Sequence, residues 1–173
     1  EIHFPSGHQT LKKALYRLKF EEFFFLQLRL LKMNLTRTEQ YRGKVLDKTG
    51  LLTKFYKEFL PFDLTNAQKR VIREIYNNLK SGLQMNRLVQ GDVGSGKTIV
   101  AFICLLVAVD SGFQTCLMAP TEILATQHYE GLKDFSAKMG LNIALLTGST
   151  SKKKRAIIHE ALKSGELNLL VGT

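Results

Sequence analysis

The stretch GDVGSGKT, residues 91–98, decides the fold of this 173-residue chain. It fits the phosphate-binding pattern GxxxxGK followed by Ser or Thr, which requires a strand before it and a helix after it. Leu88 and Val89 are expected to form a short strand, and Thr98 to Ser111 a helix that is apolar on nearly every side. Such a helix must be buried, so the loop is predicted to join a strand to a core helix.

The residue types of this loop suit a nucleoside triphosphate. Glycines let the backbone approach phosphate without Cβ clashes, so amides and the positive end of the following helix converge on the anion. Lys97 adds a charge for the β and γ phosphates, and the Thr98 hydroxyl can ligate Mg²⁺. We assign catalytic roles to Lys97 and Thr98, and nucleotide binding to Gly91, Asp92, Val93, Gly94, Ser95, Gly96, Lys97 and Thr98. The alternative is a glycine-rich turn with an exposed lysine.

Strand and helix patterns alternate on both sides of the loop. Apolar strands are expected at Cys116–Ala119, Asn142–Leu146 and Leu167–Val171, and helices at 65–82, 120–140 and 151–163. Short apolar strands separated by helices imply βαβ units and a parallel sheet that helices cover on both faces. The part of the chain from 61 to 173 is therefore predicted to be one α/β domain.

The preceding part, residues 1–60, is predicted to be a helical linker or connector. Residues from Ser6 to about Asn34 are expected to form a helix, with Ser6 and Gln9 spaced as a capping box. The apolar cluster at 23–26 packs either on a neighbouring domain or in the helix's own core. Residues 35–60 are basic and poorly periodic, which indicates a connector with short helical pieces.

Composition narrows the classes of partner. The chain has 25 basic and 15 acidic residues, a net charge of +10 and a pI near 9.7, which favours nucleic acid first and an anionic membrane second. No apolar run approaches the roughly 20 residues that span a bilayer, so we expect no membrane and an intracellular location. Cys104 and Cys116 are expected to be core residues, because neither they nor the histidines show metal-ligand spacing.

The segment FDLTNAQ, residues 62–68, permits two interpretations. Thr65 and Gln68 have the spacing of a capping box at the start of a helix. Alternatively, the Gln68 amide reads the edge of an adenine base while the Phe62 ring stacks on it. The position of the segment just upstream of a phosphate loop favours the second interpretation.

The turns after the expected strands carry candidate contacts to a nucleic-acid backbone. A Thr at a helix start with free amides suits a phosphate, although Thr121 can also be a plain cap. Lysines in the first turn of a helix are unfavourable, because they lie next to the positive end of the helix dipole. A nearby phosphate backbone would make them favourable, which predicts a nucleic-acid contact at 152–155. The alternative is a run of charges that only faces solvent. The candidate contacts are Pro120, Thr121, Thr147, Gly148, Lys152, Lys153 and Thr173.

Four segments together resemble one protein family. GDVGSGKT, MAPTEILATQHY (118–129), LLTGS (145–149) and LLVGT (169–173) are similar to the RecG-type ATP-dependent DNA helicases of superfamily two. The resemblance implies a RecA-like P-loop lobe with a truncated parallel sheet, preceded by an α-helical linker that Leu15–Leu31 resembles. It further implies ATP and Mg²⁺ as cofactors, an adenine-reading Q motif at Phe62 and Gln68, branched or forked DNA as partner, and the bacterial cytoplasm as location.

The family pattern also continues beyond this chain. An acidic DExH-type box and a second motor lobe follow the LLVGT strand in the family, and the sequence stops at Thr173. The isolated segment is therefore expected to bind nucleotide poorly, to lack DNA-stimulated ATPase activity and to self-associate through open sheet edges. Three alternatives remain: a duplex-DNA translocase of the Mfd type, which shares the GDVG start; a nucleotide-binding module that does not hydrolyse; and a small-molecule kinase, whose Arg-rich lid is missing.

Overall fold

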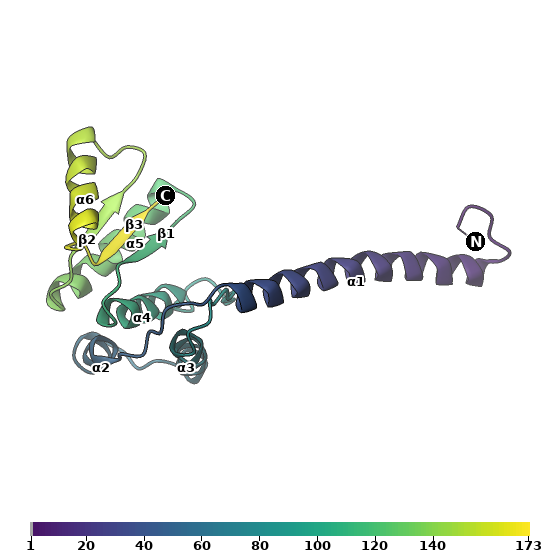
Figure 1. Cartoon of the computed structure of the whole chain (residues 1–173), viewed down its shortest axis with the longest axis horizontal. Coiled ribbons are helices and arrows are strands. Elements are labelled where there is room, and N and C mark those ends of the chain that lie inside the picture. The colour runs from purple at the N-terminus through teal and green to yellow at the C-terminus, as the bar shows by residue number, and fades with distance from the viewer. Residues whose placement is uncertain (1) are drawn as a thin grey trace. The chain divides into compact units, whose positions relative to one another are not determined.

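The computed structural model describes residues 2–173, without the side chains of 37–40, and divides into two compact units, Glu1–Arg42 and Gly43–Thr173. The first unit is formed by one long helix, α1 (His8–Gln40) (Figure 1). The second unit contains α2 (Gly50–Lys54), the π-helix η1 (Phe55–Phe59), α3 (Asn66–Lys80), α4 (Lys97–Asp110), β1 (Thr115–Met118), α5 (Glu122–Lys138), β2 (Ile143–Leu146), α6 (Lys152–Ser164) and β3 (Leu169–Gly172).

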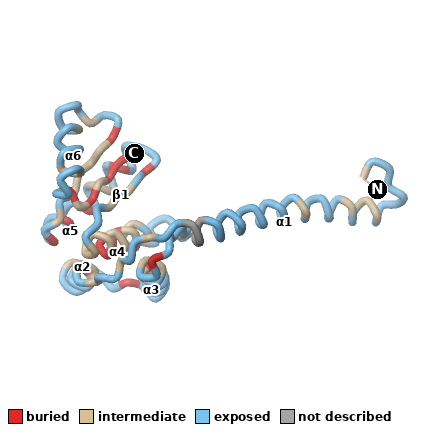
Figure 2. The backbone as a smooth tube through the Cα atoms, viewed as in Figure 1, coloured by how far each residue is buried: buried red, intermediate tan, exposed pale blue. Residues whose placement is uncertain are grey.

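Helix α1 confirms the N-terminal helix and extends it beyond Asn34 to Gln40. The extension has a local cause, because no Gly or Pro interrupts the chain before Gly43. The side chains of its apolar cluster are exposed, including Phe23 at 68% and Phe25 at 57%. Most of α1 has the pale blue of exposed residues in Figure 2. The cluster therefore does not form a core within its own unit, which leaves packing on a neighbouring domain as the open alternative.

The sheet of the second unit is parallel, as the sequence predicted. Its strand order is β1-β3-β2, and Gly172 is in register with Met118 of β1 and with Leu146 of β2. The central strand is the most buried, with Leu169 at 2% and Val171 at 0% exposure. Because the strands are parallel and in register, the carboxyl ends of all three lie side by side. We call the side of the sheet that these ends form, after β1, β2 and β3, the sheet edge.

The strand predicted at Leu88 and Val89 was wrong. The structure assigns no strand to these residues, and the Leu88 side chain is 81% exposed. A strand requires a neighbour that accepts its backbone hydrogen bonds, and within residues 2–173 no segment pairs with this one. The predicted helices at α3, α4, α5 and α6 are confirmed.

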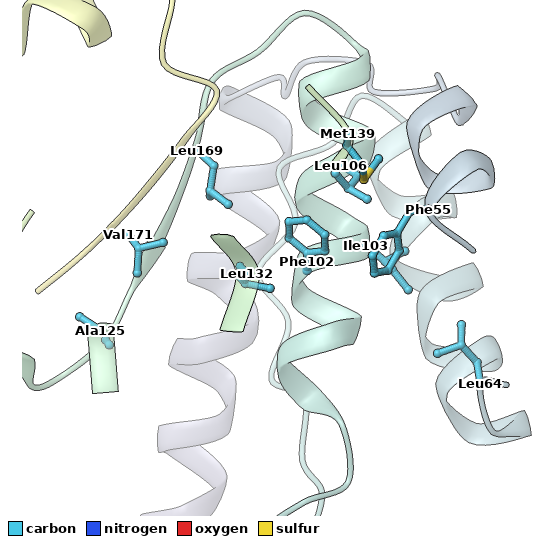
Figure 3. Close-up of a cluster of buried hydrophobic side chains, with 11 residues drawn as sticks. Phe55, Leu64, Phe102, Ile103, Leu106, Ala125, Leu132, Met139, Leu169 and Val171 are labelled. Carbon is cyan, nitrogen blue, oxygen red and sulfur yellow. The ribbon is translucent and has the colours of Figure 1, made fainter. Parts of the chain in front are cut away.

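Helix α4 is the centre of the core, as its apolar sequence predicted. Phe102 of α4 is 1% exposed and meets the ring of Phe55 edge-on, with ring centroids 5.1 Å apart. Phe135 of α5 also meets Phe55 edge-on, with ring centroids 5.2 Å apart. Figure 3 shows the cluster of buried side chains to which Phe55 and Phe102 belong. Since Phe55 is fully buried, η1 packs into the α/β unit, which as a compact unit comprises Gly43–Thr173.

The two cysteines differ in environment, and the expectation that both are core residues was wrong for Cys116. Cys104 on α4 is partly buried, and burial raises the pKa of its thiol to about 11. Cys116 is exposed on β1. The residues of that strand alternate between half-buried and exposed, because successive side chains of a strand point to opposite faces.

Candidate functional site

The loop at 91–98 has a backbone that only glycine adopts easily. Gly94 and Gly96 both have φ of +79°, a conformation that strains residues with a side chain. A Cβ on Gly91 would lie 2.7 Å from Ser95 Oγ, and a Cβ on Gly96 would lie 2.5 Å from Gln68 Nε2. The conformation of the loop therefore favours glycine at Gly94 and Gly96, and the close approach of the Ser95 side chain favours it at Gly91.

The Lys97 ammonium is held across the loop by main-chain carbonyls. Its Nζ donates to Gly91 O and to Asp92 O, both at 2.7 Å. Among the described residues, no carboxylate forms an ion pair with Lys97. The ammonium thus retains its full positive charge at the loop, where an anion can use it.

The N-terminus of α4 differs from those of the other long helices in this unit. A hydroxyl caps each of α3, α5 and α6, from Thr65, Thr121 and Ser151 respectively. The N-cap of α4 is Gly96, which has no side chain to accept from the first amides. The first-turn amides of α4, including that of Thr98, lack a side-chain acceptor and carry the positive end of the helix dipole, which makes this terminus suited to an anion.

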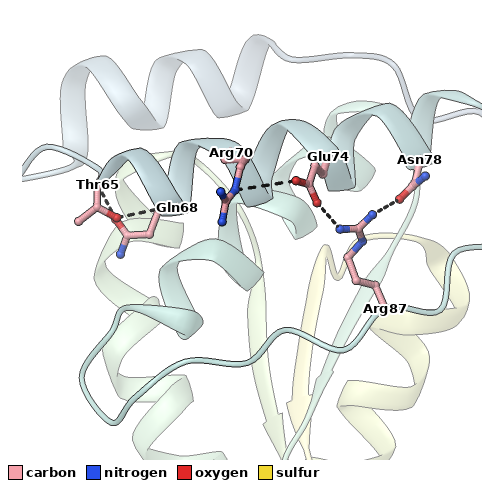
Figure 4. Close-up of polar contacts among 6 residues, drawn as sticks. All are labelled: Thr65, Gln68, Arg70, Glu74, Asn78 and Arg87. Carbon is pink, nitrogen blue, oxygen red and sulfur yellow. Dashed lines mark hydrogen bonds and ion pairs between the residues drawn. The ribbon is translucent and has the colours of Figure 1, made fainter.

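Gln68 connects helix α3 to the loop. Its Oε1 accepts from Thr65 N at 2.8 Å, and its own main-chain amide donates to Thr65 Oγ1 at 3.2 Å, so the predicted capping box is present (Figure 4). Its Nε2 donates to Ser95 O at 2.9 Å. The Phe62 ring is 50% exposed. The capping interpretation is thus confirmed, while base reading by Gln68 and Phe62 stays a prediction.

A second contact fastens the segment before the loop to α3, and sequence reasoning missed it. Arg87 donates to Glu74 Oε2 at 2.6 Å and to Asn78 Oδ1 at 2.8 Å (Figure 4). Glu74 and Asn78 are one turn apart on α3, so the planar guanidinium bridges both. No local pattern identifies this contact, because the partners of Arg87 lie on another element.

The predicted backbone contacts are brought to one edge of the sheet. Thr121 follows β1, Gly148 follows β2 and Thr173 follows β3, and register places the three strand ends side by side. Main-chain bonds tie these ends together, from Ala119 N to Gly172 O at 2.8 Å and from Thr173 N to Leu146 O at 3.3 Å. The turns after the three strands therefore lie together at one edge of the sheet, while their contact with nucleic acid stays a prediction.

The individual residues of this edge have different environments. The Thr121 hydroxyl caps α5 by accepting from Leu124 N at 3.3 Å. Thr147 is only 6% exposed, and its hydroxyl lies 3.0 Å from Ser149 Oγ. Pro120, Gly148 and Thr173 are exposed. Thr147 therefore shapes its turn from inside, while the other residues are accessible from solvent.

The basic run at 152–155 divides into two parts. Lys152 and Lys153 are exposed in the first turn of α6, as predicted. Arg155 instead donates from Nη2 to Thr147 O at 2.8 Å and is partly buried. Arg155 is thus not part of a charged run that only faces solvent, because its hydrogen bond connects α6 to the turn after β2.

Glu122 is a further residue that sequence reasoning did not place at this edge. Its two carboxylate oxygens accept from the main-chain amide of Ser149 at 2.9 Å and from the Ser149 hydroxyl at 2.8 Å. The sequence shows only an acid in the first turn of a helix, which the helix dipole explains by itself. The contact with Ser149, 27 residues away, is created by the fold.

Two other kinds of site have no support in the described part of the chain. The residues that the structure describes contain no group of three His, Cys, Asp or Glu placed to hold a metal ion. None of the helices in this described part combines the length and hydropathy needed to cross a membrane.

Comparison with known proteins places this geometry in a family. Residues 65–173 match the DEAD/DEAH box helicase family. The whole chain is 47% identical to the ATP-dependent DNA helicase RecG of Synechocystis sp., and 99% of it aligns with RecG of Streptococcus pneumoniae and of Thermotoga maritima, each at 43% identity. The chain spans only between 21% and 25% of the length of these relatives.

A solved structure agrees with these matches. The structure of RecG bound to a three-way DNA junction superposes with a TM-score of 0.85 over 98% of this chain, at 43% identity. The chain covers 23% of that protein. The expected RecA-like helicase lobe is thereby confirmed as the fold.

Proposed function

Because the chain belongs to the DEAD/DEAH box helicase family, we propose that its loop at 91–98 binds ATP with Mg²⁺ for an ATP-dependent DNA helicase. We further propose that the whole protein remodels branched or forked DNA, as its similarity to RecG supports. The observation that carries the proposal is the loop itself, with an uncompensated lysine and a helix N-terminus without a side-chain cap.

The residues of the loop fit the phosphates of a nucleotide. Gly91, Gly94 and Gly96 carry no Cβ atom, so the main chain at these three positions can approach an anion closely. The Lys97 ammonium would bind phosphate oxygens in place of its carbonyl partners, and the Thr98 hydroxyl would be a ligand of the metal. Mg²⁺, when bound, supplies positive charge that neutralises the phosphates. Asp92, Val93 and Ser95 complete the loop, and Phe62 and Gln68 receive the base.

The sheet edge is proposed to hold the backbone of a DNA strand. Pro120, Thr121, Gly148, Lys152, Lys153 and Thr173 provide backbone groups, hydroxyls and charge that suit phosphates without reading bases. Thr147 contributes by shaping its turn from inside. The net charge of +10 supports a polyanionic partner.

The rest of the machinery is proposed to lie in the longer protein. Hydrolysis requires an acidic residue that holds the metal, another that orients water, and an arginine from a facing lobe. We propose that the remaining helicase lobes supply these groups, so that this segment alone does not hydrolyse ATP. Helix α1 is proposed to act as the linker to the motor lobe. We propose the bacterial cytoplasm as location, for which the relatives support the bacterial source.

The experiment that tests the proposal measures ATP turnover by the whole protein without DNA, with linear duplex and with forked DNA of equal length. We expect forked DNA to stimulate turnover more than linear duplex does. Equal stimulation by both DNAs would support a duplex translocase instead. ATP binding without turnover on any DNA would contradict the proposal and indicate a module that does not hydrolyse.

A further inference from the structure

A carboxylate occupies the sheet edge that is otherwise rich in groups suited to phosphate. Glu122 begins α5, directly after the turn formed by Pro120 and Thr121. A free carboxylate at this position would repel a DNA backbone. Its presence at an edge with exposed lysines therefore requires a specific reason.

The contacts of Glu122 supply that reason. Oε1 accepts from the Ser149 main-chain amide at 2.9 Å, and Oε2 accepts from the Ser149 hydroxyl at 2.8 Å. Both oxygens thus bind a single residue in the turn after β2. The N-terminal position on α5 further stabilises the negative charge through the helix dipole.

Strand order explains why a side chain must make this connection. The sheet order is β1-β3-β2, so the turns after β1 and β2 are separated by the end of β3. Two strand spacings amount to roughly 10 Å, which main-chain ladder bonds cannot cross. Glu122 spans this separation and joins the turn after β1 to the turn after β2.

The turn after β2 is shaped to receive this carboxylate. A Cβ on Gly148 would lie 2.8 Å from Glu122 Oε1, so glycine permits the close approach. The Thr147 hydroxyl lies 3.0 Å from Ser149 Oγ and braces the turn from inside. Arg155 then connects Thr147 O to α6 at 2.8 Å, which links the turn to the helix of Lys152 and Lys153.

We propose that Glu122 is a positioning residue that locks the turn after β2 against the turn after β1, so that both hold one DNA strand at a fixed spacing. The inference rests on the proposed function, since it assigns DNA to this edge. Glu122 itself does not contact DNA. Its removal separates the two turns and lowers the number of phosphates that the edge binds together.

The test compares Glu122→Ala with Glu122→Gln in the whole protein, measuring DNA affinity as a function of salt concentration. Removing a negative charge from a DNA-binding edge by itself strengthens binding, whereas removing a positioning interaction weakens it. The two explanations thus predict opposite signs for Glu122→Ala. Glutamine removes the same charge but can still accept from Ser149 N and donate to Ser149 Oγ.

We expect Glu122→Ala to weaken DNA binding by about tenfold and to flatten the salt dependence by roughly 0.7 to 0.9 in log-log slope for each phosphate that is no longer bound. Glu122→Gln is expected to keep the wild-type slope and affinity, or to bind more tightly. Glu130→Ala, which removes an exposed carboxylate from the same helix, is the matched control and is expected to keep the wild-type slope.

Binding by Glu122→Ala that equals or exceeds wild type would overturn the proposal. Equal weakening in Glu122→Gln would also overturn it, because the hydrogen bonds that glutamine can keep would then not account for the effect. Thermal unfolding followed by circular dichroism identifies a variant that has lost its fold, and the rescue by glutamine still decides the question. Failure of the wild-type protein to bind DNA would instead refute the proposed function.

Discussion

Gln68 uses both ends of its side-chain amide in this structure. The carbonyl end accepts from Thr65 N and the amide end donates to Ser95 O in the phosphate loop. One N–H of the amide has no partner among these contacts, and it is the group available to a base. The residue therefore connects the cap of α3, the loop and the proposed base site, and these roles can be separated by substitution.

Gln68→Ala is expected to lower the preference for ATP over GTP more than it lowers affinity for the triphosphate, because only its amide reads the base edge. Competition between ATP and GTP for the whole protein measures the ratio. Thr65→Ala is the control, since it removes the capping hydroxyl but keeps the Gln68 amide, and its ratio is expected to match wild type. An unchanged ratio in Gln68→Ala would contradict the base-reading role.

At the scale of elements, the sequence predicted the helices whose formation depends on residues close to one another in the chain. Helix α3 followed from its capping box and apolar periodicity, and α4 from an apolar run after a glycine-rich loop. The strand at Leu88 and Val89 could not be predicted in the same way, because strand formation depends on a partner segment. The contact between Glu122 and Ser149 likewise has no local signal, since three-dimensional strand order brings the two residues together.

The first turn of α6 provides a test at this scale. Lys152→Gln with Lys153→Gln is expected to weaken DNA binding about equally for all sequences, because groups that bind phosphate do not read bases. The salt dependence should flatten by roughly 0.9 in log-log slope for each phosphate of duplex DNA that the variant no longer binds. Arg155 is left in place because it holds Thr147 O.

Lys163→Gln is the control for this pair, because Lys163 is an exposed lysine in the last turn of the same helix. Its substitution is expected to leave the slope unchanged. If the slope also stayed at the wild-type value in the Lys152 and Lys153 variant, the first turn of α6 would be a solvated face that does not touch DNA.

At the scale of the whole molecule, the two units have different surfaces. The α/β unit buries a core around Phe55 and Phe102, whereas α1 exposes four phenylalanines within residues 20–25. An exposed apolar cluster of this kind indicates packing against another domain, which suits a linker in a longer helicase. The loop at 91–98 and the sheet edge, which are the proposed nucleotide and DNA sites, both belong to the α/β unit.

The most direct test of the central claim is the affinity of the whole protein for ATP, measured by calorimetry for wild type and for Lys97→Ala. The loss of a charge-assisted partner of phosphate is worth roughly 1.5 to 3 kcal/mol, so the dissociation constant should rise by about ten- to a hundredfold or more. Lys97 is not part of the buried core, so the fold should persist by circular dichroism. ATP affinity equal to wild type in a folded Lys97→Ala protein would contradict the assignment of residues 91–98 as the nucleotide site.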